Sequence, residues 1–161
     1  MRRTLLIDAD ITVYRVASTN EVPTRFFNGL WVLWADEART KKDFDAAIED
    51  IITKTEADDY ILCLTSPNNF RKDILPSYKG NRKETRKPMM LPFLREHVMA
   101  NHPYEMRDGL EGDDLMGIYA TRPDNVGEYV IYSADKDMKT IPALLWDDVD
   151  DVAVAVAVAV A

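Results

Sequence analysis

Six carboxylates in this chain have positions that suit a metal-dependent reaction. They are Asp8, Glu111, Asp113, Asp114, Asp135 and Asp137. They lie just after predicted strands or in the first turn of a predicted helix, and ligands of open α/β sheets gather at the carboxyl ends of strands. Six carboxylates at one sheet edge would repel one another unless cations neutralised them. Oxygen ligands select Mg²⁺ or Mn²⁺, and two such ions about 4 Å apart stabilise the attacking and leaving oxygens of phosphodiester cleavage.

Five of the six carboxylates also have a purely structural explanation. Asp8 can simply end a strand, Asp113 and Asp114 can cap a helix, and Asp135 and Asp137 can be turn residues. Their joint placement behind separate strands favours a shared metal-binding role over these separate structural ones. With one Cys and two His, the sequence predicts no typical zinc site and assigns no role to His97 or His102.

The apolar pattern predicts an α/β fold with a mainly parallel sheet. Three short, continuous apolar segments read as strands covered on both faces, at residues 4–8, 60–65 and 129–133. Helical spacing of apolar residues lies between them, at residues 44–52, 91–98 and 113–122. Strands that alternate with helices are typical of parallel sheets.

Local signals add detail to this pattern. Thr40 and Asp43 resemble a capping box at the start of the first predicted helix, with Asp in the place of the usual Glu. Residues 26–34 predict an extra strand pair around Asn28-Gly29. The tryptophans Trp31, Trp34 and Trp146 are expected to pack rather than to stack on bases.

Composition bounds the class of protein. A chain of 161 residues with 47% hydrophobic and 30% charged residues suits one folded domain with a short appendage. The single cysteine, Cys63, fits a reducing compartment and lies within a predicted buried strand. No apolar run approaches the roughly 20 residues of a membrane span. We therefore expect a cytoplasmic protein with no membrane partner, of undetermined oligomeric state.

A basic segment interrupts an otherwise acidic chain. Residues 71–87 carry seven Lys/Arg and two Asp/Glu, whereas the whole chain has a net charge of −8. A basic segment beside a carboxylate cluster suits phosphate binding next to metal ions. A charged loop in solvent explains the same composition equally well.

The end of the sequence has an unusual composition. An acidic run at residues 147–151 precedes strict Val-Ala alternation from Val152 to Ala161. We expect residues 1–146 to form the domain and residues 147–161 to lie outside its fold.

Five motifs give the chain a family resemblance. They are Leu5-Leu-Ile-Asp8, Asn69-Phe-Arg-Lys72, Pro76-Ser-Tyr-Lys-Gly-Asn-Arg-Lys83, Glu111-Gly-Asp-Asp-Leu-Met-Gly117 and Ser133-Ala-Asp-Lys-Asp137. In this order, between Leu5 and Trp146, the chain resembles the phage 5′→3′ exonucleases of the flap endonuclease superfamily. The resemblance implies a PIN-like three-layer fold with a basic arch or clamp. It also implies metal-dependent 5′→3′ exonuclease or flap endonuclease activity on DNA 5′ ends, flaps or duplex.

The resemblance also implies residue roles. Carboxylates matching the first Mg²⁺ or Mn²⁺ site are Asp8, Glu111 and Asp113, and those nearer the second are Asp114, Asp135 and Asp137. Lys79 and Arg82 match catalytic residues that contact the scissile phosphate. The expected substrate-binding residues are Arg71, Lys72, Tyr78 and Lys83, with Tyr78 as a stacking face for an end nucleotide.

Two departures from the family pattern keep alternatives open. Ser66 stands where the family has a metal-binding Asp, and nothing here matches the family's helix–three-turn–helix region. An inactive nucleic-acid-binding remnant of such a nuclease is therefore one alternative. Another is a haloacid-dehalogenase-type phosphatase, because Asp8-Ala-Asp-Ile-Thr12 fits its Asp-x-Asp-x-Thr motif, with Asp8 as nucleophile and Asp10 as acid/base.

Overall fold

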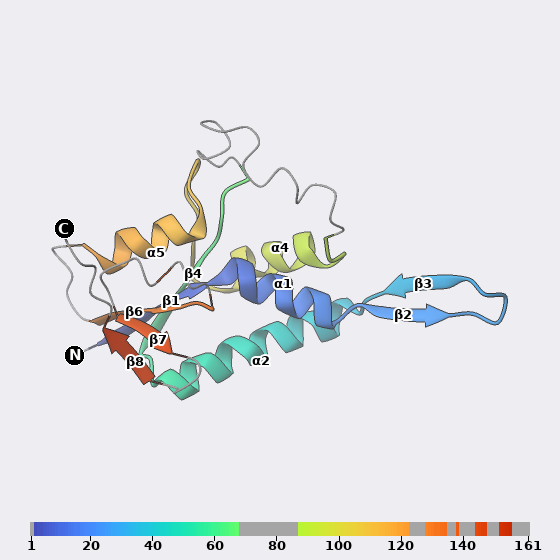
Figure 1. The fold of residues 1–161 in the computed structure, drawn as a ribbon, viewed down its shortest axis with the longest axis horizontal. Helices are drawn as coiled ribbons and strands as arrows, with labels where there is room; N and C mark the ends of the chain where they lie inside the picture. Colours follow the sequence, from blue (N-terminus) through green and yellow to red (C-terminus); the bar gives the residue numbers. More distant parts are fainter. Residues whose placement is uncertain are drawn as a thin grey trace.

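A six-stranded sheet organises the protein (Figure 1). The computed structural model describes residues 2–67, 87–122, 128–134, 138, 144–147 and 152–155. The strands of the sheet, in spatial order, are β5 (Tyr104–Glu105), β4 (Asp59–Cys63), β1 (Arg3–Asp8), β6 (Glu128–Tyr132), β7 (Leu144–Asp147) and β8 (Val152–Ala155). All neighbouring pairs are parallel except β7 and β8. This confirms the predicted α/β class and its mainly parallel sheet.

Helices cover both faces of the sheet and complete three layers. They are α1 (Ala9–Thr19), α2 (Glu37–Thr55), α4 (Leu91–Asn101) and α5 (Gly112–Ala120). Successive side chains of a strand point to opposite faces. Leu5 and Ile7 accordingly share a core with residues of α1, α2 and α4, whereas Leu6 shares the second core with Leu115 of α5.

The part of β1 from Leu5 to Asp8 is buried. Leu5, Leu6 and Ile7 are shielded from solvent, and each such side chain contributes about 1.5–3 kcal/mol relative to exposure. Cys63 of β4, which pairs with Asp8 of β1, is also fully buried, which confirms its predicted core position. Burial, together with the charge of Asp8, raises the pKa of the Cys63 thiol to about 12. This thiol is therefore a packing group rather than a nucleophile.

The start of α2 differs from the prediction. The helix begins at Glu37, and Asp36 is its N-cap, with Oδ1 accepting the backbone N–H of Arg39 at 2.8 Å. The Thr40 hydroxyl instead donates to the Asp36 carbonyl at 2.6 Å from within the helix. The predicted capping box at Thr40 is therefore wrong, because Asp36 offers an equivalent cap one turn earlier.

Helix α1 has no counterpart among the predicted helices. Its buried positions, including Ala9, Val13 and Ala17, recur at helical spacing, but many of its residues are β-branched. Such residues have low helix propensity because their side chains lose χ1 freedom. Packing against the sheet overrides that preference, as it often does for a helix with a buried face.

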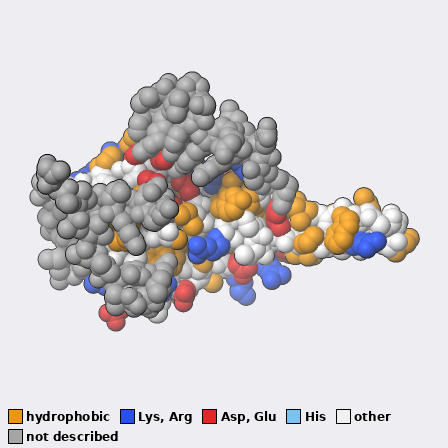
Figure 2. Space-filling model, viewed as in Figure 1, with side chains coloured by type: hydrophobic (Ala, Val, Ile, Leu, Met, Phe, Trp, Pro, Cys, Tyr) orange, Lys and Arg blue, Asp and Glu red, His pale blue; other side chains and the backbone are white. Residues whose placement is uncertain are grey.

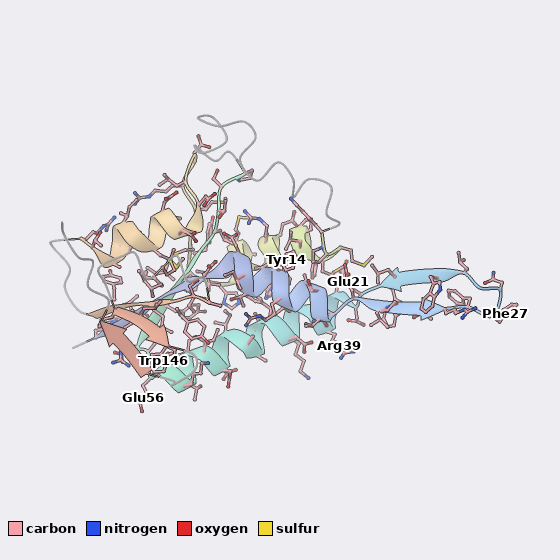
Figure 3. All side chains as sticks on the ribbon, in the orientation of Figure 1. Tyr14, Glu21, Phe27, Arg39, Glu56 and Trp146 are labelled. Carbon is pink, nitrogen blue, oxygen red and sulfur yellow. The ribbon has the colours of Figure 1, made fainter. Side chains whose placement is uncertain are left out.

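The predicted strand pair is present as a hairpin of β2 (Val22–Arg25) and β3 (Trp31–Trp34), which extends away from the body of the protein (Figure 1). Gly29 takes a φ of 83° in its turn, where Phe27, completely exposed, marks the tip (Figure 3). Trp31 and Trp34 are exposed, so their predicted packing role is wrong, whereas Trp146 is buried as expected. Hydrophobic side chains thus line the hairpin surface (Figure 2).

Part of the unusual tail belongs to the sheet. Val152–Ala155 forms β8 and pairs antiparallel with β7, so the expectation that the tail lies wholly outside the fold is wrong. Val-Ala alternation contains no residue that breaks a strand, and β8 covers an edge of β7 that would otherwise be unpaired. Among the described residues, no helix is both long and apolar enough to cross a membrane.

Candidate active site

Asp8 lies where β1 ends and α1 begins. Its side chain is 4% exposed and acts as the N-cap of α1, with Oδ1 accepting the N–H of Ile11 at 3.5 Å. The hydroxyl of Ser133, which directly follows β6, donates to Asp8 Oδ2 at 2.9 Å. Parallel pairing of β1 with β6 therefore places Ser133 next to the Asp8 carboxylate, as expected for two motifs that each follow a strand of the same sheet.

Burial makes the Asp8 carboxylate costly to ionise. Burial, with smaller contributions from the nearby charges of Asp10 and Asp113, raises the pKa of Asp8 to about 7, against the lowering effect of the Ser133 hydrogen bond. A buried anion with acidic neighbours favours either protonation or a bound cation. The electrostatics at this strand end therefore suit a metal ligand.

The N-terminal end of α5 brings the second group of carboxylates to the same place. Glu111 and Asp114 form a reciprocal capping box, in which Asp114 Oδ2 accepts the Glu111 N–H at 2.9 Å. Asp113 is close enough to raise the pKa of Asp8. The positive end of the helix dipole favours carboxylates in this turn. Figure 2 shows acidic side chains gathered near this end of α5.

Close packing of α5 against β4 explains the glycine of the acidic motif, Gly112. A Cβ at this position would lie 3.0 Å from the Cys63 carbonyl oxygen and 3.1 Å from Asp10 Oδ2. The backbone of α5 can therefore approach β4 only without a side chain here. The neighbouring loops are also tied together, because the N–H of buried Ser66 donates to the Leu110 carbonyl at 2.9 Å.

A polar network next to Asp8 holds these elements in place. Arg95 of α4 pairs with Asp10 Oδ1 at 3.2 Å and donates to the Thr65 carbonyl at 2.8 Å. The Thr65 N–H and hydroxyl both donate to Asp10, and the Gly112 N–H donates to Thr65 Oγ1 at 3.0 Å. Asp10 thus connects α1, α4, α5 and the end of β4, whereas the phosphatase alternative expects it to act as an acid/base.

Several predicted site residues lie outside the described residues. They are Arg71, Lys72, Tyr78, Lys79, Arg82, Lys83, Asp135 and Asp137. Of the six carboxylates, the described part of the chain brings Asp8, Asp113 and the Glu111–Asp114 pair to one sheet edge. Sequence reasoning missed Thr65 and Arg95. Arg95 stands alone within an amphipathic helix, and no local pattern marks its partner 85 residues earlier.

We predict that Asp8→Asn stabilises the metal-free protein at neutral pH. The folded state raises the Asp8 pKa from 3.8 to about 7, so it binds this proton more tightly than the unfolded state. Stability is therefore lost as pH rises from about 4 to 7, by up to about 4 kcal/mol. Urea unfolding in EDTA should show the variant more stable than wild type at pH 8 and nearly equal at pH 4. Parallel pH profiles would contradict the buried-anion assignment.

We also predict that Gly112→Ala disturbs the site through the backbone. The added methyl group would lie 3.0 Å from a backbone carbonyl oxygen, so α5 and β4 would have to separate by a few tenths of an ångström, and stability should fall by about 1–3 kcal/mol. Thermal unfolding measures the stability and Mn²⁺ titration measures metal affinity, and we expect both the stability and the affinity to fall. Gly112→Ser should be at least as damaging, and a neutral result for both variants would contradict the close approach.

Known proteins show the same sequence pattern. Residues 3–143 match the family described as 5′-3′ exonuclease, N-terminal resolvase-like domain. The exodeoxyribonuclease of Enterobacteria phage T3 is 34% identical over 146 residues, covering 86% of this chain and 48% of that protein. The exonuclease of Escherichia phage T7 is also 34% identical over 146 residues, covering 86% and 49%. The chain thus spans about half the length of these relatives.

Solved structures show the same fold. The bacteriophage T5 D15 protein crystallised with metal ions aligns with a TM-score of 0.64 and 16% identity, over 94% of this chain and 57% of that chain. A T5 D15 flap endonuclease complex with DNA and metal ions gives a TM-score of 0.65 and 17% identity over the same shares. The three-layer arrangement expected from the resemblance is therefore the fold that this chain shares with the T5 D15 protein. With residues 3–143 matched, the chain belongs to the 5′-3′ exonuclease family and contains its N-terminal resolvase-like domain.

Proposed function

We propose that this chain is the catalytic part of a divalent-metal-dependent nuclease that hydrolyses DNA phosphodiester bonds in the 5′→3′ direction. Its substrates would be DNA 5′ ends, flaps or duplex, and residues 1–146 would form the nuclease domain, with β8 added to the edge of its sheet. The observation that carries the proposal is the meeting of Asp8 with the acidic N-terminus of α5 at one sheet edge. The names of the T3 and T7 relatives, and a T5 neighbour bound to DNA and metal ions, support the same activity.

The donor set fits hard divalent cations. Its members would be Asp8, Glu111 and Asp113 around one ion, with Asp114, Asp135 and Asp137 nearer a second. All are carboxylates, which suits Mg²⁺ or Mn²⁺ better than softer metals. When bound, such ions neutralise charge on the attacking and leaving oxygens of the phosphodiester. The raised pKa of Asp8 supports this assignment, because a nearby cation would compensate the buried charge.

The chain's own residues position this cluster. Ser133 orients the Asp8 carboxylate by donating to Oδ2, and the α5 backbone holds Glu111 and Asp114 in their capping box. Arg95 pairs with Asp10 and so offsets part of the repulsion that Asp10 exerts on Asp8. These contacts fix the direction of the carboxylates before substrate arrives, which avoids a reorganisation cost during the reaction.

The basic segment would bring the substrate phosphates to the carboxylates. Lys79 supplies a compact charge and Arg82 a bidentate fork for the scissile phosphate. Tyr78 would stack on a terminal nucleotide, whereas Arg71, Lys72 and Lys83 would contact the backbone. The length and net charge of +5 of residues 71–87 support this role.

We predict that Asp113→Asn abolishes metal-dependent cleavage. A lost carboxylate removes charge from the metal site without changing side-chain size, so a loss of at least about 100-fold is expected. A 5′-labelled flap or duplex incubated with Mg²⁺ or Mn²⁺ measures product release. The matched control is Asp43→Asn, an exposed aspartate of α2, which should cleave normally. Absence of cleavage by the wild type would instead favour the inactive binding remnant, and activity in EDTA would contradict the metal assignment.

We further predict that Lys79→Ala and Arg82→Ala each slow cleavage at least about tenfold while leaving the melting temperature unchanged. Their short polar segment, punctuated by Pro76 and Gly80, offers little apolar surface to bury, so they are expected to serve the substrate. Single-turnover cleavage and thermal unfolding of the same preparations separate the two roles. A large loss of stability with normal cleavage would show that these residues support the fold instead.

A further inference from the structure

Two histidines and an aspartate meet on the helical layer formed by α2 and α4. His97 Nε2 lies 2.8 Å and His102 Nε2 lies 2.7 Å from the same oxygen, Asp45 Oδ1. The three donor atoms all lie within 4.8 Å of one another. The sequence assigned neither histidine a role, because Asp45 lies more than 50 residues earlier and only the packing of α2 against α4 brings it near.

This cluster is separate from the catalytic carboxylates. His102 contacts Tyr60 at the start of β4, and Tyr60 pairs with Leu5 of β1. The next pair of interest, Asp8 with Cys63, lies three residues farther along both strands. The two pairs are therefore about 10 Å apart along the sheet. The histidines also face the core around Phe44, whereas Asp113 approaches Asp8 from α5 across the sheet.

The donor set differs in chemistry as well as in place. Two imidazole nitrogens and one carboxylate oxygen suit Zn²⁺, which binds such ligands at about 2.0–2.2 Å in tetrahedral geometry. In that geometry, neighbouring donors would stand roughly 3.3 Å apart. The observed separations from Asp45 Oδ1 are therefore about half an ångström too short. Asp45 can move outward to lengthen these separations, because its side chain is 49% exposed, whereas those of His97 and His102 are 7% and 9% exposed.

The surrounding contacts hold both imidazole rings with Nε2 toward Asp45 Oδ1. Tyr60 Oη lies 2.9 Å from His102 Nδ1, and the Asn101 side-chain nitrogen lies 3.1 Å from His97 Nδ1. Phe44 packs against the two imidazoles in edge-to-face geometry. When Nε2 binds a metal, Nδ1 carries the proton and needs an acceptor. The Tyr60 oxygen can accept it from His102. At His97, the Asn101 amide, whose nitrogen donates to the His97 carbonyl in this structure, must turn its oxygen toward Nδ1.

We propose that Asp45, His97 and His102 bind a Zn²⁺ ion that fastens α2 to the C-terminal end of α4. Solvent at the exposed side of Asp45 would supply the fourth ligand. Since α4 also carries Arg95, which holds Asp10 and Thr65, the ion would stabilise the helix that supports the active site. The alternative is a metal-free arrangement, in which both imidazoles donate their Nε2–H groups to Asp45.

Zinc titration of the whole protein tests the proposal. The protein is stripped with EDTA, transferred to chelator-free buffer with excess Mg²⁺ to saturate oxygen-only sites, and titrated with Zn²⁺ by calorimetry. We expect one Zn²⁺ to bind and the melting temperature to rise by several degrees. Asp45→Asn, which keeps the size of an exposed side chain, and His102→Gln should each weaken binding about tenfold or more.

Two control variants locate the ion. Asp43→Asn, on the same helix but outside the cluster, and Asp113→Asn, in the carboxylate site, should both bind Zn²⁺ like wild type. Co²⁺ in place of Zn²⁺ should give the intense visible absorption of a four-coordinate site, lost in Asp45→Asn and kept in Asp113→Asn. The proposal is overturned by a wild type that binds no Zn²⁺, by unchanged binding in Asp45→Asn, or by binding lost in Asp113→Asn. None of these results depends on nuclease activity.

Discussion

Parallel pairing of β1 with β4 on one side and β6 on the other is the constraint from which the candidate active site follows. It sets Asp8 beside Cys63 and brings Ser133, just past β6, within hydrogen-bond distance of the carboxylate. Because the interior of β1 is completely buried, a slip of its register would expose apolar side chains as well as move Asp8. The same packing that stabilises the sheet therefore fixes the position of the chemistry.

The cost of this arrangement is electrostatic. Burial favours a neutral Asp8, yet the proposed chemistry needs its anion next to Asp113 and Asp10. Two neutral donors, the Ser133 hydroxyl and the Ile11 N–H, stabilise the Asp8 anion. The Arg95 guanidinium pairs with the neighbouring Asp10. Active sites commonly carry such a stability cost, which a bound cation offsets.

The sequence predicted features that depend on local patterns. The three apolar segments became β1, β4 and β6, the Asn28-Gly29 signal became a hairpin, and the acidic motif became the first turn of α5. Features that depend on distant partners were missed, because no periodicity links Arg95 to Asp10 or Asp45 to His97. Helix α1 was missed for another reason, since its β-branched residues favour a strand locally and only tertiary packing makes it helical.

The Val-Ala alternation of β8 has a consequence for how uniquely this strand can be placed. In the observed pairing Val154 lies opposite Leu145 and Ala155 opposite Leu144. Because the sequence repeats every two residues up to Ala161, a displacement of two residues sets Val and Ala opposite the same partners. The repeat thus makes alignments two residues apart nearly equal in energy, so the sequence of β8 does not specify a unique sliding position along β7.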